Sequence, residues 1–363
     1  ERLQWETSNQ LDIGIEAGLF KNRIYVSADF FDKRTRNLLY EQKLPNTTGF
    51  SKFWTNLGKV RFWGYELELT TRNIVKKNFS WESKLVLSYQ QNKVLKLPDN
   101  GIDKNRTGGI ALGDGTFFGG IAEGEPLNRF YGYVATGIIE TEEQAANANY
   151  DALSRLPQKG AKRVGDYEWA DRNGDGQITT ADQFCLGVTV PPFTGGLQNS
   201  FRLKNWTLSL YLDWATGHSI FDESYSRYFY GTFTNNYALA KDVLKAWKKP
   251  GDKTKYAKFY ANDSNWGNDN YNRSPTNTFT YKGDYLCLRE ITLQYSLPSK
   301  LFTKVGLKGV TLTVSGNNLC YLTEVKGISP ETGASTTYEG SGDNAYYNYP
   351  PIRRFSFGVR LIF

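Results

Sequence analysis

Methionine is absent from this sequence, and histidine occurs only once, at His218. One histidine leaves almost no material for a His-dependent catalytic triad or a His-rich metal site. The three cysteines, Cys185, Cys287 and Cys320, form no Cys-x-x-Cys pair, so they indicate neither a zinc site nor a disulfide framework. The chain begins with neither methionine nor a signal peptide, so we expect it to be part of a longer or processed polypeptide.

Long hydrophobic runs are also lacking. No stretch approaches the roughly 18 consecutive apolar residues that a membrane-spanning helix needs, and the mean hydropathy is −0.53. Aromatic residues are nevertheless abundant, with 9 Trp, 24 Tyr and 22 Phe, which argues against a disordered chain. A polar average with many aromatics is typical of a transmembrane β-barrel, in which only every second strand residue must be apolar.

The formal net charge is +7, but the basic residues form no single block. The densest runs, at 76–79 and 245–258, match no nucleic-acid-binding module. We interpret them as solvated turns and loops, and we predict no nucleic-acid partner.

Alternation with a period of two dominates the chain. The terminal stretch RRFSFGVRLIF puts five apolar side chains on one strand face, and the same pattern recurs upstream. The terminal residues, which we also expect the outer-membrane assembly machinery to recognise, are Phe355, Phe357, Val359, Leu361 and Phe363. Further alternating segments lie at 11–19, 24–30, 63–69, 81–89, 206–214, 290–297 and 310–315, and another begins near 195. The pattern predicts an all-β fold, an antiparallel transmembrane β-barrel of which this chain supplies about nine or ten strands.

Connections of two kinds separate these segments. Short turns lie at 20–23, 73–78, 203–206 and 297–306, and long connections at about 33–60, 91–194, 215–283 and 317–352. Short turns at one end and long loops at the other are the signature of an outer-membrane barrel. A soluble β-sandwich or propeller would also alternate, but it would not usually sort its connections in this way. An odd strand number that starts in mid-pattern indicates further strands upstream or in another chain.

Several motifs, in order, resemble the C-terminal barrel portion of SusC-type TonB-dependent outer-membrane transporters. They are the strand–turn–strand segment at 3–40, EGEPLNRFYGYVATGII at 123–139, the block GDYEWADRNGDGQITTADQFCLGVTVPPFTGGLQNSF at 165–201, YLCLREITLQYSLP at 285–298, VTLTVSGNNL at 310–319 and the terminal strand. The resemblance covers nearly the whole of 1–363, with 91–194 as a long extracellular loop region, but it lacks the family's N-terminal plug.

The resemblance implies a function that is not enzymatic. It predicts TonB-driven import of oligosaccharides or oligopeptides across the outer membrane of a Gram-negative bacterium. The implied partners are a SusD-like surface lipoprotein, the TonB complex acting through the missing N-terminal part, and the lipids of the outer membrane. A passive porin-like or structural barrel is one alternative, and a soluble, calcium-stabilised carbohydrate-binding β-protein is another.

The stretch DRNGDGQITTAD at 171–182 has the spacing of an EF-hand calcium loop. Its candidate ligands are Asp171, Asn173, Asp175, Gln177, Thr179 and Asp182. Pro191 and Pro192 follow closely and argue against a long exiting helix, although ITTADQF is able to form one helical turn capped by Thr179 or Thr180. Calcium would be structural here, and the alternative is a metal-free loop supported by its own Asx turns.

Aromatic side chains in the long connections are candidates for contacts with cargo, because flat rings stack on sugar faces. Packing within the loops is the competing interpretation for most of them. The four residues that we single out as substrate-binding are Trp54, Tyr230, Trp266 and Tyr347. Other candidates are Phe53, Tyr225, Tyr228, Phe229, Tyr346 and Tyr349.

Overall fold

The computed structural model describes most of the chain, in ranges separated by gaps. The described residues are 3–43, 49, 52–56, 58–99, 103–106, 110–111, 117–118, 120–154, 162–222, 225–226, 229, 239–260, 269–271, 276–301, 306–331 and 352–363. Among these residues, no helix combines the length and apolar character needed to span a membrane.

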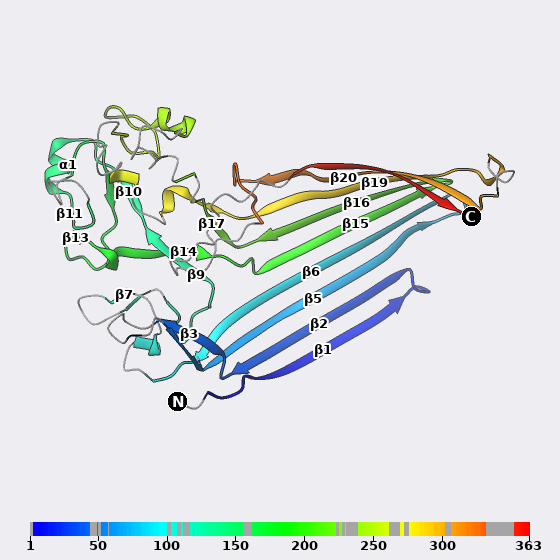
Figure 1. Cartoon of the computed structure of the whole chain (residues 1–363), viewed down its shortest axis with the longest axis horizontal. Helices are drawn as coiled ribbons and strands as arrows, with labels where there is room; N and C mark the ends of the chain where they lie inside the picture. Colours follow the sequence, from blue (N-terminus) through cyan, green and yellow to red (C-terminus); the bar gives the residue numbers. More distant parts are fainter. Residues whose placement is uncertain are drawn as a thin grey trace.

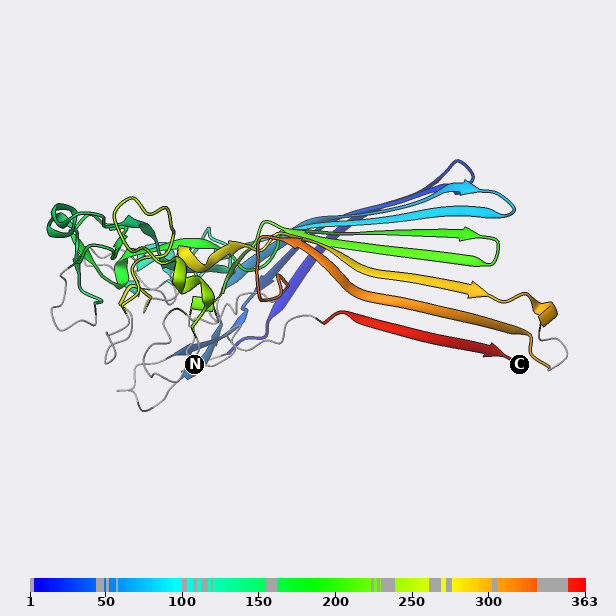
Figure 2. The ribbon, with the colours of Figure 1, turned by 90° about the horizontal axis from the view of Figure 1, so that it is seen from above.

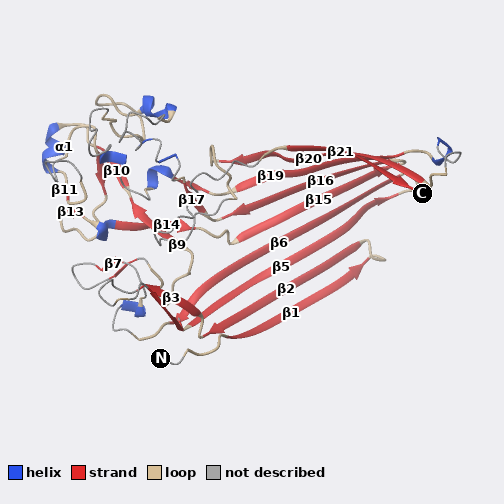
Figure 3. Cartoon of the chain, in the orientation of Figure 1, coloured by secondary structure: helices blue, strands red, loops and turns tan. Residues whose placement is uncertain are grey.

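One antiparallel sheet dominates the architecture (Figures 1 and 3). Within the described residues it has nine strands, in the order β1-β2-β5-β6-β15-β16-β19-β20-β21. Their bounds are β1 Thr7–Leu19, β2 Ile24–Arg36, β5 Lys59–Val75, β6 Phe79–Lys96, β15 Phe193–Leu203, β16 Trp206–Thr216, β19 Tyr285–Ser296, β20 Gly309–Thr323 and β21 Arg354–Ile362. The order follows the chain, so every long strand pairs with its sequence neighbours, as in an up-and-down barrel wall.

The sheet is curved. Figure 1 shows β1 to β6 face-on and β19 to β21 nearly edge-on, and Figure 2 gives the perpendicular view. The four short connections β1–β2, β5–β6, β15–β16 and β19–β20 lie at the end near the C-terminus. The long connections lie at the opposite end and carry most of the small elements. The predicted separation of short and long connections is therefore present.

Strand register collects the apolar side chains on one continuous face. Ile15 pairs with Ala28, and the row continues through Leu67, Leu87, Gly195, Trp214 and Leu286 to Leu322 on β20. At Gly195 a side chain would collide with the Trp214 indole, which lies over the glycine and fills that position. A one-residue slip of any strand would send its apolar set to the other side. We name this surface the apolar face.

The opposite surface, the polar face, carries the alternate residues. Glu68 pairs with Ser27, Glu66 with Asp29 and Ser88, and Lys84 forms an ion pair of 2.8 Å with Glu68. Glu66, Glu68 and Glu82 thus share one phase of the sheet, opposite to the apolar rows. A sheet that is apolar on one side and polar on the other separates lipid from water.

A second body of structure, which we call the loop module, forms at the long-connection end from short elements. These are β9 Arg129–Tyr133, β10 Ala135–Ile138, α1 Glu142–Asn147, β11 Tyr150–Asp151, β12 Tyr167–Trp169, β13 Gln177–Ile178, η3 Thr180–Asp182, β14 Gln183–Val188, β17 Ser219–Phe221, η4 Lys241–Lys245, η5 Asp269–Tyr271, η6 Asn277–Phe279 and β18 Thr280–Lys282. β9 and β10 lie outside the main sheet, within the predicted long loop region 91–194.

Small hairpins complete the described fold. β3 Leu39–Lys43 pairs with β4 Lys52–Asn56, and β7 Ile110–Ala111 pairs with β8 Phe117–Phe118. Two short 3-10 helices, η2 Asp103–Asn105 and η7 Ser299–Leu301, lie in connections. The described residues alone do not close a barrel, because β1 and β21 each pair with a single strand.

Candidate functional site

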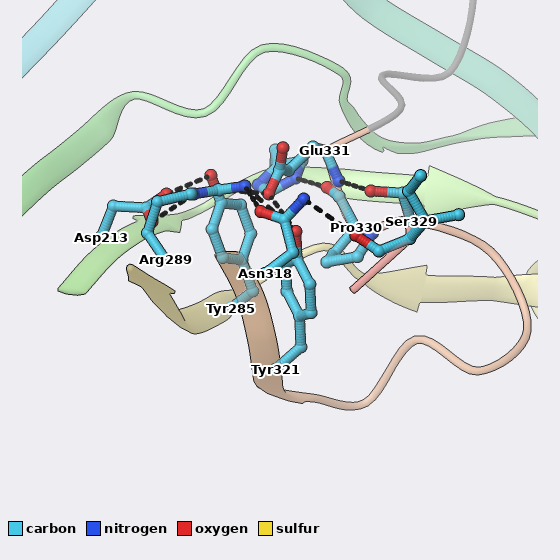
Figure 4. Close-up of polar contacts among 10 residues, drawn as sticks. Asp213, Tyr285, Arg289, Asn318, Tyr321, Ser329, Pro330 and Glu331 are labelled. Carbon is cyan, nitrogen blue, oxygen red and sulfur yellow. Dashed lines mark hydrogen bonds and ion pairs between the residues drawn. The ribbon is translucent and has the colours of Figure 1, made fainter. Parts of the chain in front are cut away.

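The most connected polar cluster on the polar face is centred on Arg289 in β19. The pairing of β19 shifts by one residue next to Arg289, against both β16 and β20. Such a bulge inserts an extra residue and redirects its side chain. Arg289 therefore joins Asp213 and Tyr321 on the polar face (Figure 4), although Leu288 beside it pairs within the apolar rows.

The guanidinium of Arg289 uses nearly all of its donors. Its Nε donates to Asp213 Oδ1 at 2.8 Å, and its Nη2 donates to Asp213 Oδ2 at 2.7 Å. Nη1 donates to Asn318 Oδ1 at 2.8 Å and to the Tyr321 hydroxyl at 3.2 Å, while Nη2 also forms an ion pair with Glu331. The two parallel bonds to one carboxylate give strength and a fixed orientation.

These contacts attach the segment that follows β20 to the wall of the sheet. Tyr321 donates its hydroxyl hydrogen to Glu331 Oε1 at 2.8 Å, so Glu331 is held by two neighbours (Figure 4). The preceding carbonyl, of Pro330, lies 3.2 Å from Nε2 of the buried His218. Residues 324–331 are therefore fixed both to the strands and to the connection that follows β16. We call this arrangement the Arg289 clamp.

The sequence analysis missed the clamp, although the sequence contains a signal for it. Apolar residues in β19 fall at Leu286 and Leu288 and then at Ile291, Leu293 and Tyr295. The change from even to odd positions indicates one inserted residue between Leu288 and Ile291. The pattern could thus have predicted a bulge at Arg289, but the partners of its side chain come from β16, β20 and a loop.

A second charged cluster, around Glu125, lies next to the long-connection end of β6. Lys104 Nζ is 3.0 Å from Glu125 Oε1, and Arg106 Nη2 is 3.2 Å from the same oxygen. Arg129 Nη1 lies 3.5 Å from Oε2. Burial by itself raises the pKa of Glu125, but the hydrogen bond from Lys104 and the charge of Arg106 outweigh it, so the pKa falls below its usual value.

This shift predicts a pH dependence at the junction of 103–106 with 120–131. A carboxyl whose pKa is lowered on folding stabilises the fold above its ordinary pKa, and the contribution disappears as the pH falls through the lowered value. We expect amide exchange at the junction, corrected for its intrinsic pH dependence, to accelerate selectively below about pH 4. Glu125→Gln should make exchange at pH 7 faster and should abolish most of that pH dependence, and an unchanged profile would contradict this assignment.

The loop module has its own aromatic core. Phe229 is fully buried, and its ring centroid lies 4.7 Å from that of Tyr256, 5.1 Å from Tyr271 and 5.2 Å from Phe279. Tyr271 donates its hydroxyl hydrogen to the carbonyl of Ala257 at 2.6 Å, and burial raises its pKa. Such packing gives the module an internal core that is separate from the sheet.

The substrate-binding predictions fare differently in this module. Phe229, one of the wider cargo candidates, is fully buried in the aromatic core, which supports the competing interpretation of packing within the loops. Tyr225 is half-buried, donates its hydroxyl hydrogen to Asp242 Oδ2 at 2.7 Å and packs on the same core. Trp54 in β4 is 55% exposed, which leaves its ring accessible. Tyr230, Trp266 and Tyr347 lie outside the described residues.

The EF-hand-like loop is folded but is flanked by strands, β12 before it and β14 after it. Asp171 accepts hydrogen bonds from the Gly174 and Gly176 amides at 2.7 and 2.8 Å. Asn173 Oδ1 accepts from the Asp175 amide at 3.1 Å, and Asp175 Oδ1 accepts from the Gln177 amide at 2.8 Å. Each polar side chain thus satisfies a backbone group a few residues onward, as in successive Asx turns.

Asp182, at the twelfth position of the loop, is fully buried. Its carboxylate accepts from the Arg172 amide at 2.9 Å and from the Thr179 amide at 2.7 Å. Thr179 in turn caps η3, and this confirms the predicted single helical turn. Among the described residues, no three His, Cys, Asp or Glu side chains gather in a way that could hold a metal ion. The geometry therefore fits the self-supported loop better than a calcium cage, and calcium binding stays a prediction.

Chelation distinguishes the two interpretations of 171–182. Since the backbone amides already hold the carboxylates, we expect EGTA to change the rate of proteolysis within this loop by less than about twofold. The measurement is limited proteolysis of the full-length receptor in detergent, with and without added Ca²⁺. An acceleration of tenfold or more that Ca²⁺ reverses would show that an ion holds the loop.

The terminal strand β21 is exposed on both of its faces, because among the described residues it pairs only with β20. Exposed fractions are 65% for Phe355, 81% for Phe357, 66% for Val359, 48% for Leu361 and 76% for Phe363. These residues lie on the apolar face, as predicted, because Phe357 pairs with Val314 and Val359 pairs with Leu312, which are apolar residues of β20. Their use as an assembly signal stays a prediction.

A curved antiparallel sheet with a continuous apolar face on one side and charged clusters on the other defines the wall of a transmembrane β-barrel. The comparison with known families agrees with this class. Residues 1–213 match the family model described as TonB dependent receptor-like, beta-barrel. The chain belongs to this TonB-dependent receptor family, whose members are outer-membrane proteins.

Individual relatives support the assignment over the whole chain. TonB-dependent receptor P3 of Formosa agariphila is 31% identical over 373 residues, which cover 100% of this chain and 35% of that protein. TonB-dependent receptor SusC of Bacteroides thetaiotaomicron is 24% identical over 371 residues, covering 100% of this chain and 32% of SusC. The chain therefore spans about a third of the length of these relatives.

Solved structures agree on the fold. The structure of the RagAB peptide transporter superposes with a TM-score of 0.72 at 21% identity, over 98% of this chain and 35% of the other. Together with the family model and the curated relatives, this fold confirms the predicted SusC-type barrel and its outer-membrane location, and the soluble alternative is wrong. The relatives are receptors rather than enzymes, which agrees with the prediction of no enzymatic activity.

Proposed function

We propose that this chain forms the C-terminal part of the wall of a TonB-dependent outer-membrane importer of oligosaccharides or oligopeptides. One observation supports the proposal most strongly. A membrane-type wall, apolar on one face, carries on its polar face the Arg289 clamp, which holds a long connection inward beside a folded loop module. A simple pore needs no such module. A gated importer needs ordered loops that select cargo and contact a partner.

In this proposal the loop module faces the cell exterior and the short turns face the periplasm. A SusD-like surface lipoprotein would cover the module, because the relatives include SusC and the solved neighbours include the RagAB complex. TonB would act from the periplasm through parts of the receptor outside this chain. The exposed ring of Trp54 and the predicted residues Tyr230, Trp266 and Tyr347 remain candidates for contact with cargo.

Uptake measurements test the proposal. Cells that express the full-length receptor with its surface lipoprotein should accumulate labelled oligosaccharides or labelled oligopeptides, and a protonophore should abolish accumulation. Whichever class accumulates identifies the cargo. Uptake that is insensitive to the protonophore and follows the external concentration would instead indicate the passive porin-like barrel. Co-purification of the lipoprotein with the receptor in detergent tests the partner separately.

A further inference from the structure

The short-connection end of the sheet carries charge of one sign. The turns at 20–23, 76–78 and 204–205 and the connection at 297–308 contain no aspartate or glutamate. Their described basic residues are Lys21, Arg23, Lys76, Lys77, Lys204, Lys300 and Lys308, and all seven are exposed. The long connections at the other end carry charges of both signs, with fourteen acidic and eight basic residues in 97–192 and seven acidic and ten basic residues in 217–284. We call the seven residues the basic rim.

On β6, β15, β16 and β19, the strand ends next to the basic rim carry a row of aromatic side chains on the apolar face. Trp206 and Tyr295 pair across β16 and β19, with ring centroids 4.4 Å apart. Trp81 and Phe201 stack across β6 and β15 at 5.6 Å. Aromatic rings of this kind mark the level where the hydrocarbon of a bilayer meets its headgroups.

Chain geometry places the cations at headgroup level. Lys204 and Asn205 form the turn between the paired residues Leu203 and Trp206, so Lys204 lies at the tip of the hairpin, just beyond the aromatic row. Lysine stems extend further along the interface, so these ammonium groups reach the phosphate layer of the adjoining leaflet. Among described residues, the ammonium groups of Lys76, Lys77, Lys300 and Lys308 form no hydrogen bond or ion pair, so their charges are available to a ligand.

We propose that the basic rim binds the headgroups of anionic phospholipids in the leaflet that surrounds the short-turn end of the barrel. The charge is complementary to that of the lipid, and the aromatic row fixes the depth at which the charges meet. A basic side chain near an anionic membrane surface contributes about a fivefold increase in affinity. The inference does not depend on the identity of the cargo.

Lipid retention by the full-length receptor tests the inference. The receptor is stripped of lipid in detergent and exposed to equal amounts of phosphatidylglycerol and phosphatidylcholine, and the bound lipids are counted by native mass spectrometry. The wild type should retain phosphatidylglycerol preferentially. The quadruple variant Lys76→Gln, Lys77→Gln, Lys300→Gln and Lys308→Gln should lose this preference by about tenfold or more.

A matched variant controls for the loss of four charges. Lys241→Gln, Lys248→Gln, Lys249→Gln and Lys253→Gln remove four exposed lysines from the loop module at the opposite end. This control variant should keep the wild-type preference for phosphatidylglycerol. Raising the salt concentration should weaken that preference in the wild type and in the control variant alike. Equal binding of the two lipids by the wild type would overturn the proposal and would favour an acidic protein as the ligand of the rim. Equal losses in both quadruple variants, or a rim variant that keeps its preference, would overturn it as well.

Discussion

Replacement of Phe279 by alanine is expected to destabilise the loop module by about 3 to 5 kcal/mol, the usual cost of removing a buried phenyl ring. Phe279 is 2% exposed, and its ring centroid lies 5.2 Å from that of Phe229 and 6.2 Å from those of Tyr225 and Tyr271. Because these aromatic rings come from separate segments, one cavity weakens several contacts at once. Amides of β12 and of the segment 254–258 should therefore exchange at least a hundredfold faster.

Hydrogen–deuterium exchange of the full-length receptor in detergent measures this effect. Phe279→Leu is the matched control, since it keeps most of the apolar volume and should cost less than half as much. Exchange in β15 and β16 of the main sheet should stay unchanged in both variants. Protection in the module that survives Phe279→Ala would contradict the central position of this ring in the core.

Replacement of Arg289 by methionine should release residues 324–331 from the wall, at a cost of about 2 to 3 kcal/mol. The substitution removes both bonds to Asp213 and leaves Asp213 and Glu331 without their shared counter-charge. Removing one partner of a fully buried pair costs about 3 to 5 kcal/mol. Our value is lower because the Arg289 and Asp213 side chains are 25% and 15% exposed and water screens the remaining charges.

Exchange of the amides between Val325 and Glu331 measures the release and should accelerate by about thirtyfold or more. Arg289→Lys retains the charge but loses the two-pronged contact with Asp213, so we expect an intermediate rate. Arg353→Met is the control, because the exposed Arg353 forms no hydrogen bond or ion pair among the described residues. If the lysine variant matches the wild type, the clamp depends on charge alone and its geometry is unimportant.

The clamp gives the uptake experiment a second purpose. A connection held against the polar face narrows the interior of a barrel, and a released one changes the path that is open to cargo. If 324–331 shape that path, Arg289→Met should alter the size of the oligomers that are taken up while the receptor level in the membrane stays constant. Arg353→Met should leave that size selection unchanged.

The sequence by itself determined the wall of this protein. Strand residues alternate between the two faces of the sheet, so the period of two in segments such as 11–19 and 355–363 marks the strands without knowledge of their neighbours. The short turns and the long connections could be told apart from the number of residues between consecutive alternating segments. The single helical turn η3 was also predictable, because its cap, Thr179, bonds to residues only two or three positions further along the chain. The ordered motifs were sufficient to indicate the family.

Only the tertiary structure decided what the side chains of the connections do. Phe229 looks like an accessible aromatic residue in the sequence, yet it is buried by Tyr256, Tyr271 and Phe279, which lie 27 to 50 residues further along the chain. Asp182 occupies a ligand position of a calcium motif, but folding turns its carboxylate toward two backbone amides. Arg289 meets Asp213, which is 76 residues away, only because a bulge and the strand order bring them together. Periodicity is a local property that the sequence displays directly, whereas these contacts depend on register and loop packing, which arise when distant segments meet.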